Sequence, residues 1–93
     1  MTLLSEAAVA AELAETPGWK RVGKTIDRTY RFQNFKDAMF FVNGVAALAE
    51  SAGHHPDIAI HGNVVVLSLW THSAGGLTAK DFALARKIDA VQA

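Results

Sequence analysis

Residues 57–69 read DIAIHGNVVVLSL, two runs rich in apolar residues separated by Gly62-Asn63. A two-residue turn with glycine first is typical of a type II′ β-hairpin. With these two residues at the centre of the turn, one face of the hairpin carries the apolar pairs Ile58–Leu67 and Ile60–Val65. A slip of one residue would turn these pairs to the opposite face, so the pattern predicts this register.

The same register predicts that three of the four histidines lie close together. Extended backwards, it places His55 opposite Trp70 and His72 diagonal to His55, on the face away from the core isoleucines. Diagonal neighbours across a strand pair are roughly 7–8 Å apart, and His54 then lies near Thr71. Histidine changes its charge close to neutral pH. We therefore expect this cluster to perform acid–base chemistry.

The remainder of the chain predicts three helices and a second strand pair around this hairpin. Ser5 and Asn34 are N-cap residues, Gly53 is a helix stop, and Thr78 with Asp81 forms a capping box. The expected elements, in order, are a helix from Ser5 to Thr16, strands 19–22 and 25–32, a helix over 35–52, strands 57–61 and 64–72, and a C-terminal helix. This α-β-β-α-β-β-α order predicts an α+β fold, with three helices on one face of a four-stranded antiparallel sheet.

The expected helix over residues 35–52 is apolar nearly all round. One stripe at helical spacing consists of Ala38, Phe41, Val42, Val45, Leu48, Ala49 and Ala52. Much of the remaining surface consists of Phe35, Met39, Phe40, Ala46 and Ala47. A helix of this kind is buried on two sides, and one sheet in a chain of this length covers only one. We therefore expect a homo-oligomer, a dimer or tetramer, formed through this helix and the sheet edge.

Composition narrows the class of protein. The 93 residues predict one domain, 1–93, with 51% hydrophobic residues to form its core. Nine Lys and Arg balance nine Asp and Glu, which argues against nucleic-acid binding. The absence of cysteine excludes disulfides, a thiolate nucleophile and a cysteine zinc site. No apolar run reaches membrane-spanning length and no signal-peptide pattern begins the chain, so we expect a soluble, cytoplasmic protein.

Two carboxylates near the histidines allow more than one interpretation. Glu50 lies in the last turn of its expected helix, where the helix dipole disfavours a carboxylate, so we expect it to orient a histidine. A zinc site formed by histidines with Glu50 or Asp57 is an alternative. Adjacent residues of an extended segment point to opposite sides, however, so His54 and His55 do not readily share one ion. We rank the metal site below acid–base catalysis and expect no metal and no cofactor.

The pattern as a whole resembles the pterin-4a-carbinolamine dehydratase family. The motifs that carry the resemblance are Glu50-x-x-x-His54-His55-Pro56-Asp57, Thr71-His72-x-x-Gly75-Gly76-Leu77-Thr78-x-x-Asp81, and Gly18-Trp19 near the start. It implies a four-stranded antiparallel sheet with three helices, and dimers that assemble into tetramers. It also implies that a pterin substrate, 4a-hydroxytetrahydropterin, is dehydrated to quinonoid dihydropterin. That reaction recycles the pterin cofactor of aromatic amino acid hydroxylases, and it needs an acid and a base but no metal.

Carried over position by position, the resemblance implies three catalytic histidines. One of His54 and His72 protonates the leaving hydroxyl and the other takes the N5 proton, while His55 binds and orients the pterin; the sequence leaves open which does which. Glu50 and Asp81 are the expected supporting residues, although Asp81 has an independent explanation as the second half of a capping box. The expected substrate-binding residues are Trp19, Asp57, Trp70 and Thr71.

Two positions depart from the family pattern and bear on substrate preference. Members usually carry an aromatic residue where this chain has Gly62, and Ser or Thr where it has Trp70. Relatives of this fold also act as coactivators or assembly factors. The alternative function is therefore a dehydratase-like binding protein with little or no activity.

Overall fold

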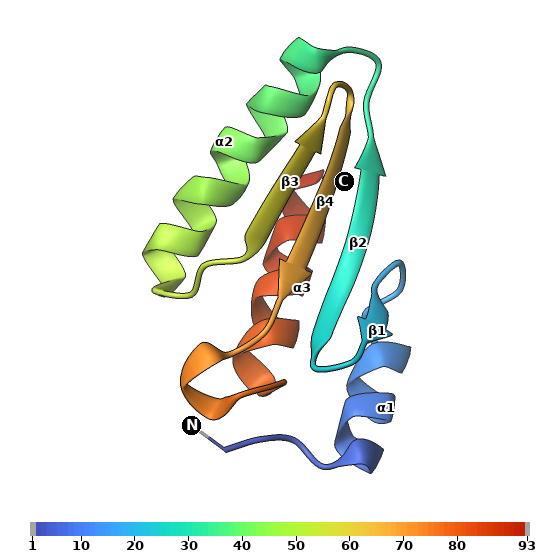
Figure 1. The fold of residues 1–93 in the computed structure, drawn as a ribbon, viewed down its shortest axis with the longest axis vertical. Coiled ribbons are helices and arrows are strands. Elements are labelled where there is room, and N and C mark those ends of the chain that lie inside the picture. The colour runs from blue at the N-terminus through green and yellow to red at the C-terminus, as the bar shows by residue number, and fades with distance from the viewer. Residues whose placement is uncertain (1, 93) are drawn as a thin grey trace.

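The computed structural model describes residues 2–92 and contains three α-helices and a four-stranded antiparallel sheet (Figure 1). Its elements, in order, are α1 (Glu6–Ala14), β1 (Lys20–Val22), β2 (Thr25–Arg31), α2 (Phe35–Ala52), β3 (Asp57–His61), β4 (Val64–Leu69), the 3₁₀-helix η1 (His72–Ala74) and α3 (Ala79–Gln92). The predicted α-β-β-α-β-β-α order and α+β class are therefore confirmed. No helix among residues 2–92 is long and apolar enough to cross a membrane.

The β3–β4 hairpin has the predicted register. Ile58 lies opposite Leu67, and Ile60 lies opposite Val65. Gly62 has a φ of 61°, whereas Asn63 does not have a positive φ, which is the combination that a type II′ turn requires. Strand β4 also pairs with β2, so the sheet order is β1-β2-β4-β3 and β3 forms one edge.

The predicted strand over residues 64–72 is too long at its C-terminal end. Strand β4 stops at Leu69, which pairs with Ile26 near the start of β2. The ladder to β3 ends one residue earlier, at Asp57 and Ser68. Neither ladder continues past these pairs, and beyond Leu69 the chain pairs with itself through a bridge between Thr71 and Gly76. The expected pairing of His55 with Trp70 is therefore wrong, and His72 lies in η1.

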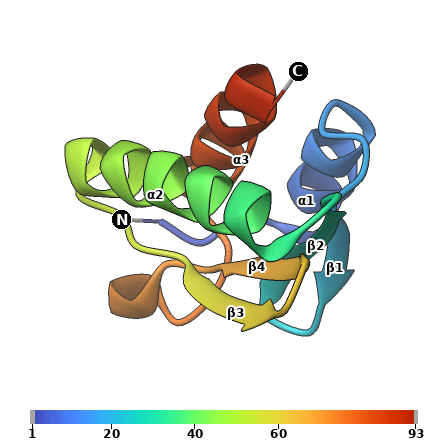
Figure 2. The same ribbon diagram turned by 90° about the horizontal axis from the view of Figure 1, so that it is seen from above.

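All three helices cover one face of the sheet (Figure 2). Asn34 caps the start of α2 by accepting a hydrogen bond from the Asp37 N–H at 2.8 Å, and Gly53 ends it with a left-handed φ of 63°. The side of α2 that faces the core carries Ala38, Phe41, Val42, Val45 and Ala49. These side chains pack with a sheet layer formed by Ile26, Tyr30, Val65, Leu67 and Leu69, and with Phe82, Leu84, Ala85 and Ile88 of α3.

A polar cluster that the sequence did not predict joins α3 to β2. The Asp89 carboxylate accepts hydrogen bonds from Trp19 Nε1 at 2.9 Å and from the Tyr30 hydroxyl at 2.7 Å. Arg28 Nη1 lies 3.2 Å from the same carboxylate. Burial of the Tyr30 phenol, together with its hydrogen bond to Asp89, raises its pKa well above the usual range. Asp89 thus fixes the buried polar atoms of two aromatic side chains.

Candidate active site

His54 is positioned by the end of α2. The Gly53 N–H donates to the Glu50 carbonyl and the His54 N–H donates to the Ala49 carbonyl, both at 3.1 Å, which together form a Schellman motif. This turn directs the His54 side chain into the protein, where it is buried. Its Nε2 atom lies 2.5 Å from Oδ1 of Asp81. The helix stop that glycine provides therefore also sets the position of the first histidine.

Asp81 holds His54 from the other side of the site, through a buried network. The second carboxylate oxygen of Asp81, Oδ2, accepts the Thr78 N–H and the Thr71 hydroxyl, each at 2.9 Å. The hydroxyls of Thr71 and Thr78 lie 2.8 Å apart. The bond from the Thr78 N–H to Oδ2 of Asp81 belongs to the predicted capping box at the start of α3. Asp81 therefore caps a helix and contacts a histidine at the same time, so the two interpretations of this residue are compatible.

His55 points to a different carboxylate. Its Nε2 atom lies 3.0 Å from Oε1 of Glu50, and both side chains are exposed, at 68% and 82%. An ion pair this exposed contributes little to stability. Its consequence is geometric, because Glu50 restricts the orientation of the His55 ring. Of the two adjacent histidines, His55 contacts Glu50, whereas His54 contacts Asp81.

His72 contacts neither carboxylate. Its ring stacks on the indole of Trp70, with a centroid separation of 3.9 Å and an interplanar angle of 28°. The Lys24 ammonium lies 4.1 Å from the centroid of the Trp70 ring, in the geometry of a cation–π contact. The third histidine is therefore restrained by an aromatic surface.

These three histidines line one pocket of about 400 Å³. Its remaining lining residues are Gly53, Pro56, Asp57, Thr71, Ser73 and Lys80. The sequence reasoning brought His54, His55 and His72 to one place, and the structure does so too, through the end of α2, the start of β3 and η1. Lys80 and Ser73 were missed. In the sequence, Lys80 directly precedes Asp81 and Ser73 directly follows His72. This adjacency to motif residues is the signal that could have identified them as pocket residues.

The other expected site residues occupy different positions. Trp19 is buried beside Tyr30 and Asp89 and does not line the histidine pocket. Trp70 lies against His72 and is not part of the lining either. Thr71 lines the pocket, but its hydroxyl is already hydrogen-bonded to Asp81 and Thr78. Asp57 is exposed and lines the pocket directly.

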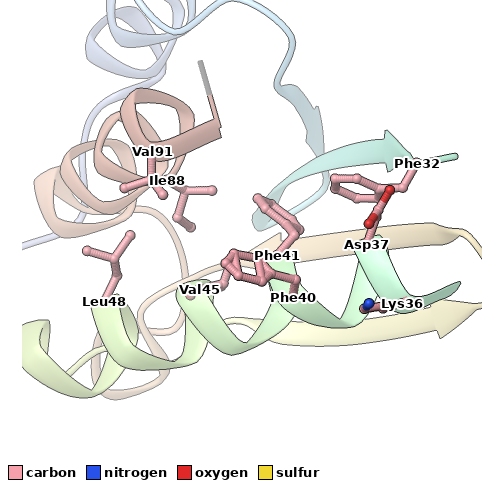
Figure 3. A pocket seen from close by; sticks show the side chains of 10 residues that line it. Phe32, Lys36, Asp37, Phe40, Phe41, Val45, Leu48, Ile88 and Val91 are labelled. Atoms are coloured by element: carbon pink, nitrogen blue, oxygen red, sulfur yellow. The ribbon is translucent and has the colours of Figure 1, made fainter. Parts of the chain in front are cut away.

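A second depression, of about 470 Å³, lies between α2 and the end of α3 (Figure 3). Its lining is mostly apolar and includes Phe32, Phe40, Leu48 and Val91, with the charged residues Lys36 and Asp37. It contains no histidine, so it offers no acid–base pair for chemistry at neutral pH. We therefore place the candidate active site at the histidine pocket.

The rival metal site finds no support in the arrangement of ligands. Among residues 2–92, no group of three or more His, Cys, Asp or Glu side chains is placed to hold a metal ion. His54 and His55 instead contact Asp81 and Glu50 separately.

Comparison with known proteins shows the family of this chain. The model of the family described as pterin 4 alpha carbinolamine dehydratase matches residues 2–91. The chain belongs to this family. A Thermomicrobium roseum protein with the name "Putative pterin-4-alpha-carbinolamine dehydratase" is 57% identical over 88 residues, 95% of each chain. A Chloroflexus aurantiacus protein of the same name is 56% identical over 91 residues, 98% of each chain.

Solved structures of the family share the fold. The crystal structure of a transcriptional coactivator/pterin dehydratase from Brucella melitensis matches with a TM-score of 0.93 at 33% identity, covering 98% of this chain and 99% of that one. A pterin dehydratase-like protein, identified as a RuBisCO assembly factor in the alpha-carboxysome, matches with a TM-score of 0.69 at 26% identity. That match covers 80% of this chain and 88% of the other. The family thus includes proteins described by enzymatic and by assembly roles.

Proposed function

We propose that this chain dehydrates 4a-hydroxytetrahydropterin to quinonoid dihydropterin, with His54 and His72 as the acid–base pair. The observation that carries the proposal is the convergence of three histidines on one pocket, with His54 held by the buried carboxylate of Asp81. The reaction would recycle the pterin cofactor of an aromatic amino acid hydroxylase, and a cytoplasmic location is part of the same proposal.

The chemistry requires two proton transfers and no change of oxidation state. The 4a-hydroxyl takes a proton and leaves as water, which breaks the C4a–O bond. N5 loses its proton, and the electron pair of the N–H bond forms the N5=C4a double bond. Two groups that titrate near neutral pH are suited to both steps.

The surroundings of each histidine favour one of the two roles. When Asp81 is ionised, its Oδ1 accepts a hydrogen bond from the Nε2–H of His54, which leaves the Nδ1 lone pair free to take the N5 proton. The carboxylate then stabilises the imidazolium that forms, as in other carboxylate–histidine pairs. His72 is exposed and can be reprotonated from solvent, which suits the acid that releases water. His55, oriented by Glu50, would hold the pterin at the pocket entrance.

A dehydration assay of the wild type and matched histidine variants tests this proposal. We expect His54→Gln and His72→Gln each to lower kcat by about 10²- to 10⁴-fold, because each removes one proton-transfer group. His61→Gln is the control, since His61 is exposed at the far end of β3 beside the hairpin turn. A folded His72→Gln variant with wild-type kcat would show that the proposed pair is wrong.

The alternative function is a binding protein of the coactivator or assembly-factor kind. The observation that favours it is the match, at 26% identity, to a pterin dehydratase-like protein identified as a RuBisCO assembly factor. Turnover of 4a-hydroxytetrahydropterin by the purified wild type separates the two functions. No turnover, with the chain folded, would favour the binding role.

We propose further that a second copy of the chain covers the apolar groove between α2 and α3. Phe40 and Phe35 of α2 are 76% and 58% exposed, and Val91 of α3 is 63% exposed. At the sheet edge, Ile58 and Ile60 of β3 remain 36% and 37% exposed although they face the helix side. A formal net charge of zero leaves no overall repulsion between copies. These features support a dimer or tetramer formed through α2 and the edge strand.

Sedimentation of wild type and Phe40→Glu tests the oligomer. We expect the wild type to be a dimer or larger at micromolar concentration and the variant to shift toward a smaller species. Lys36→Glu is the control at the end of the same groove, where a charge is already present. A wild type that sediments as a monomer would contradict the proposal.

A further inference from the structure

The three histidines of the pocket are restrained by different means. His54 and His55 each contact a carboxylate through Nε2. Within residues 2–92, the His72 side chain makes no hydrogen bond, and its close ring contact is the indole of Trp70. The orientation of this imidazole therefore depends on stacking.

The backbone around His72 is held more firmly than its side chain. The Thr71 N–H donates to the Gly76 carbonyl at 2.8 Å, and the Ala74 N–H donates to the Thr71 carbonyl at 3.1 Å. Gly75 closes the turn with a left-handed φ of 75°. These bonds fix the backbone position from which the His72 side chain extends. They leave the ring of an exposed residue free to choose among rotamers, and ordering a side chain costs entropy.

Trp70 supplies the missing restraint from outside the pocket. His72 lines the pocket, whereas Trp70 stacks on His72 without lining the pocket. Lys24 contacts the same indole through its ammonium group, 4.1 Å from the ring centroid. This cation–π contact restricts the indole in turn.

We infer that Trp70 is a positioning residue that holds the His72 imidazole in its working orientation, without contacting the substrate itself. The inference rests on the proposed function, because it concerns the ring that would protonate the leaving hydroxyl. It differs from the expectation that Trp70 binds the substrate directly. A stacked aromatic pair is favourable enough to raise the population of the stacked orientation about 2- to 10-fold.

The test compares Trp70→Phe, which keeps an aromatic face, with Trp70→Leu, which keeps an apolar side chain without one. We expect Trp70→Leu to lower kcat about 2- to 10-fold with little change in KM, because fewer molecules hold His72 correctly. Trp70→Phe should retain most of the wild-type kcat. Val66→Leu is the control on β4, since Val66 is half-buried at the middle of the strand, away from His72.

A second readout does not depend on activity. The indole ring current shifts the ring protons of a stacked imidazole upfield in the NMR spectrum, and the His72 signals are assigned by their loss in His72→Gln. We expect these signals to move downfield in Trp70→Leu and to stay largely upfield in Trp70→Phe. This measurement uses the substrate-free protein, so it distinguishes failure of the stack from failure of the proposed dehydratase function.

Two kinetic results from the variants would overturn the inference. One is a rise in KM at unchanged kcat in Trp70→Leu, which would make Trp70 a wall of the substrate site. The other is equal kcat values for the Leu and Phe variants, which would show that the aromatic face has no effect. If the wild type stacks His72 but has no turnover, the proposed function fails and Trp70 has no reaction to assist, so the inference fails with it.

Discussion

Replacing Asp81 with asparagine tests how the buried network controls His54. Asparagine has the shape of aspartate but only one acceptor oxygen. The Thr78 N–H and the Thr71 hydroxyl both donate to Oδ2, so the asparagine oxygen should occupy that position. Its NH₂ group then faces Nε2 of His54, which must become an acceptor. In Asp81→Asn the proton of neutral His54 therefore moves to Nδ1, the nitrogen that should accept the substrate proton.

The expected magnitudes follow from this geometry. A bond to a charged acceptor is worth about 1 kcal/mol more than a neutral one, and three bonds are affected. The loss of stability is thus at most about 3 kcal/mol, small enough for most domains to remain folded. The loss of kcat should be larger, about 10²- to 10⁴-fold, because the base is present in the wrong tautomer.

Two measurements on the same sample check this prediction. Long-range ¹H–¹⁵N NMR of the histidine rings reports which nitrogen of His54 carries the proton, and rapid-mixing absorbance reports the rate of dehydration. Urea unfolding confirms that the variant is folded under assay conditions. If His54 in Asp81→Asn keeps its proton on Nε2, or if kcat stays within a few-fold of wild type, the assignment of Asp81 is refuted.

Two further predictions concern the fold around the site. Because burial raises the pKa of Tyr30, the folded state keeps the proton that the unfolded state loses, so stability should fall as pH rises above about 10. Tyr30 is the single tyrosine of the chain, so phenolate absorbance at 295 nm should appear only with unfolding, and Tyr30→Phe should lose less stability over that pH range. An absorbance rise in the folded protein near pH 10 would contradict this. Separately, Gly18→Ala should cost more than Gly23→Ala in urea unfolding, by about 1 kcal/mol. Both have a positive φ, but only at Gly18 would the new Cβ meet Arg28, 2.5 Å away; equal losses would mean that Arg28 moves aside freely.

Local patterns predicted much of the fold because each had a strong physical cause. The Gly62-Asn63 turn and the alternation of Ile58 and Ile60 were sufficient to predict the β3–β4 register. The helix over 35–52 was predicted with its correct bounds because Asn34 and Gly53 are strong start and stop signals. The end of β4 was wrong because strand length depends on where the neighbouring strands stop, and β-propensity carries no such information.

The site was predicted in part, for a related reason. Sequence spacing brought His54, His55 and His72 together, but it could not predict which carboxylate each ring would contact. The partner of His54 is Asp81, 27 residues away, rather than the nearby Glu50. Contacts of this kind depend on how α3 packs against the end of α2, which no local pattern specifies.

One departure from the family pattern proves remote from this chain's own pocket. Gly62 lies at the hairpin tip, whereas Asp57 lines the pocket at the opposite end of β3. Gly62 follows Asp57 by five positions along an extended strand, a distance of about 17 Å at about 3.3 Å per residue. Of the two departures, Trp70 is the one that contacts a residue lining the pocket, His72.

The Asp81 carboxylate has two roles, and this affects which residues can distinguish active dehydratases from inactive members of the family. The carboxylate caps α3 through Thr78 and also holds His54, so a descendant that had lost catalysis would still need it for folding. Among the described residues, the His72 side chain is exposed and makes no hydrogen bond, so the fold does not depend on an imidazole at this position. In family members that lose dehydratase activity and become assembly factors, we expect His72 to be replaced first and Asp81 last. Retention of His72 is therefore the more informative marker of an active dehydratase.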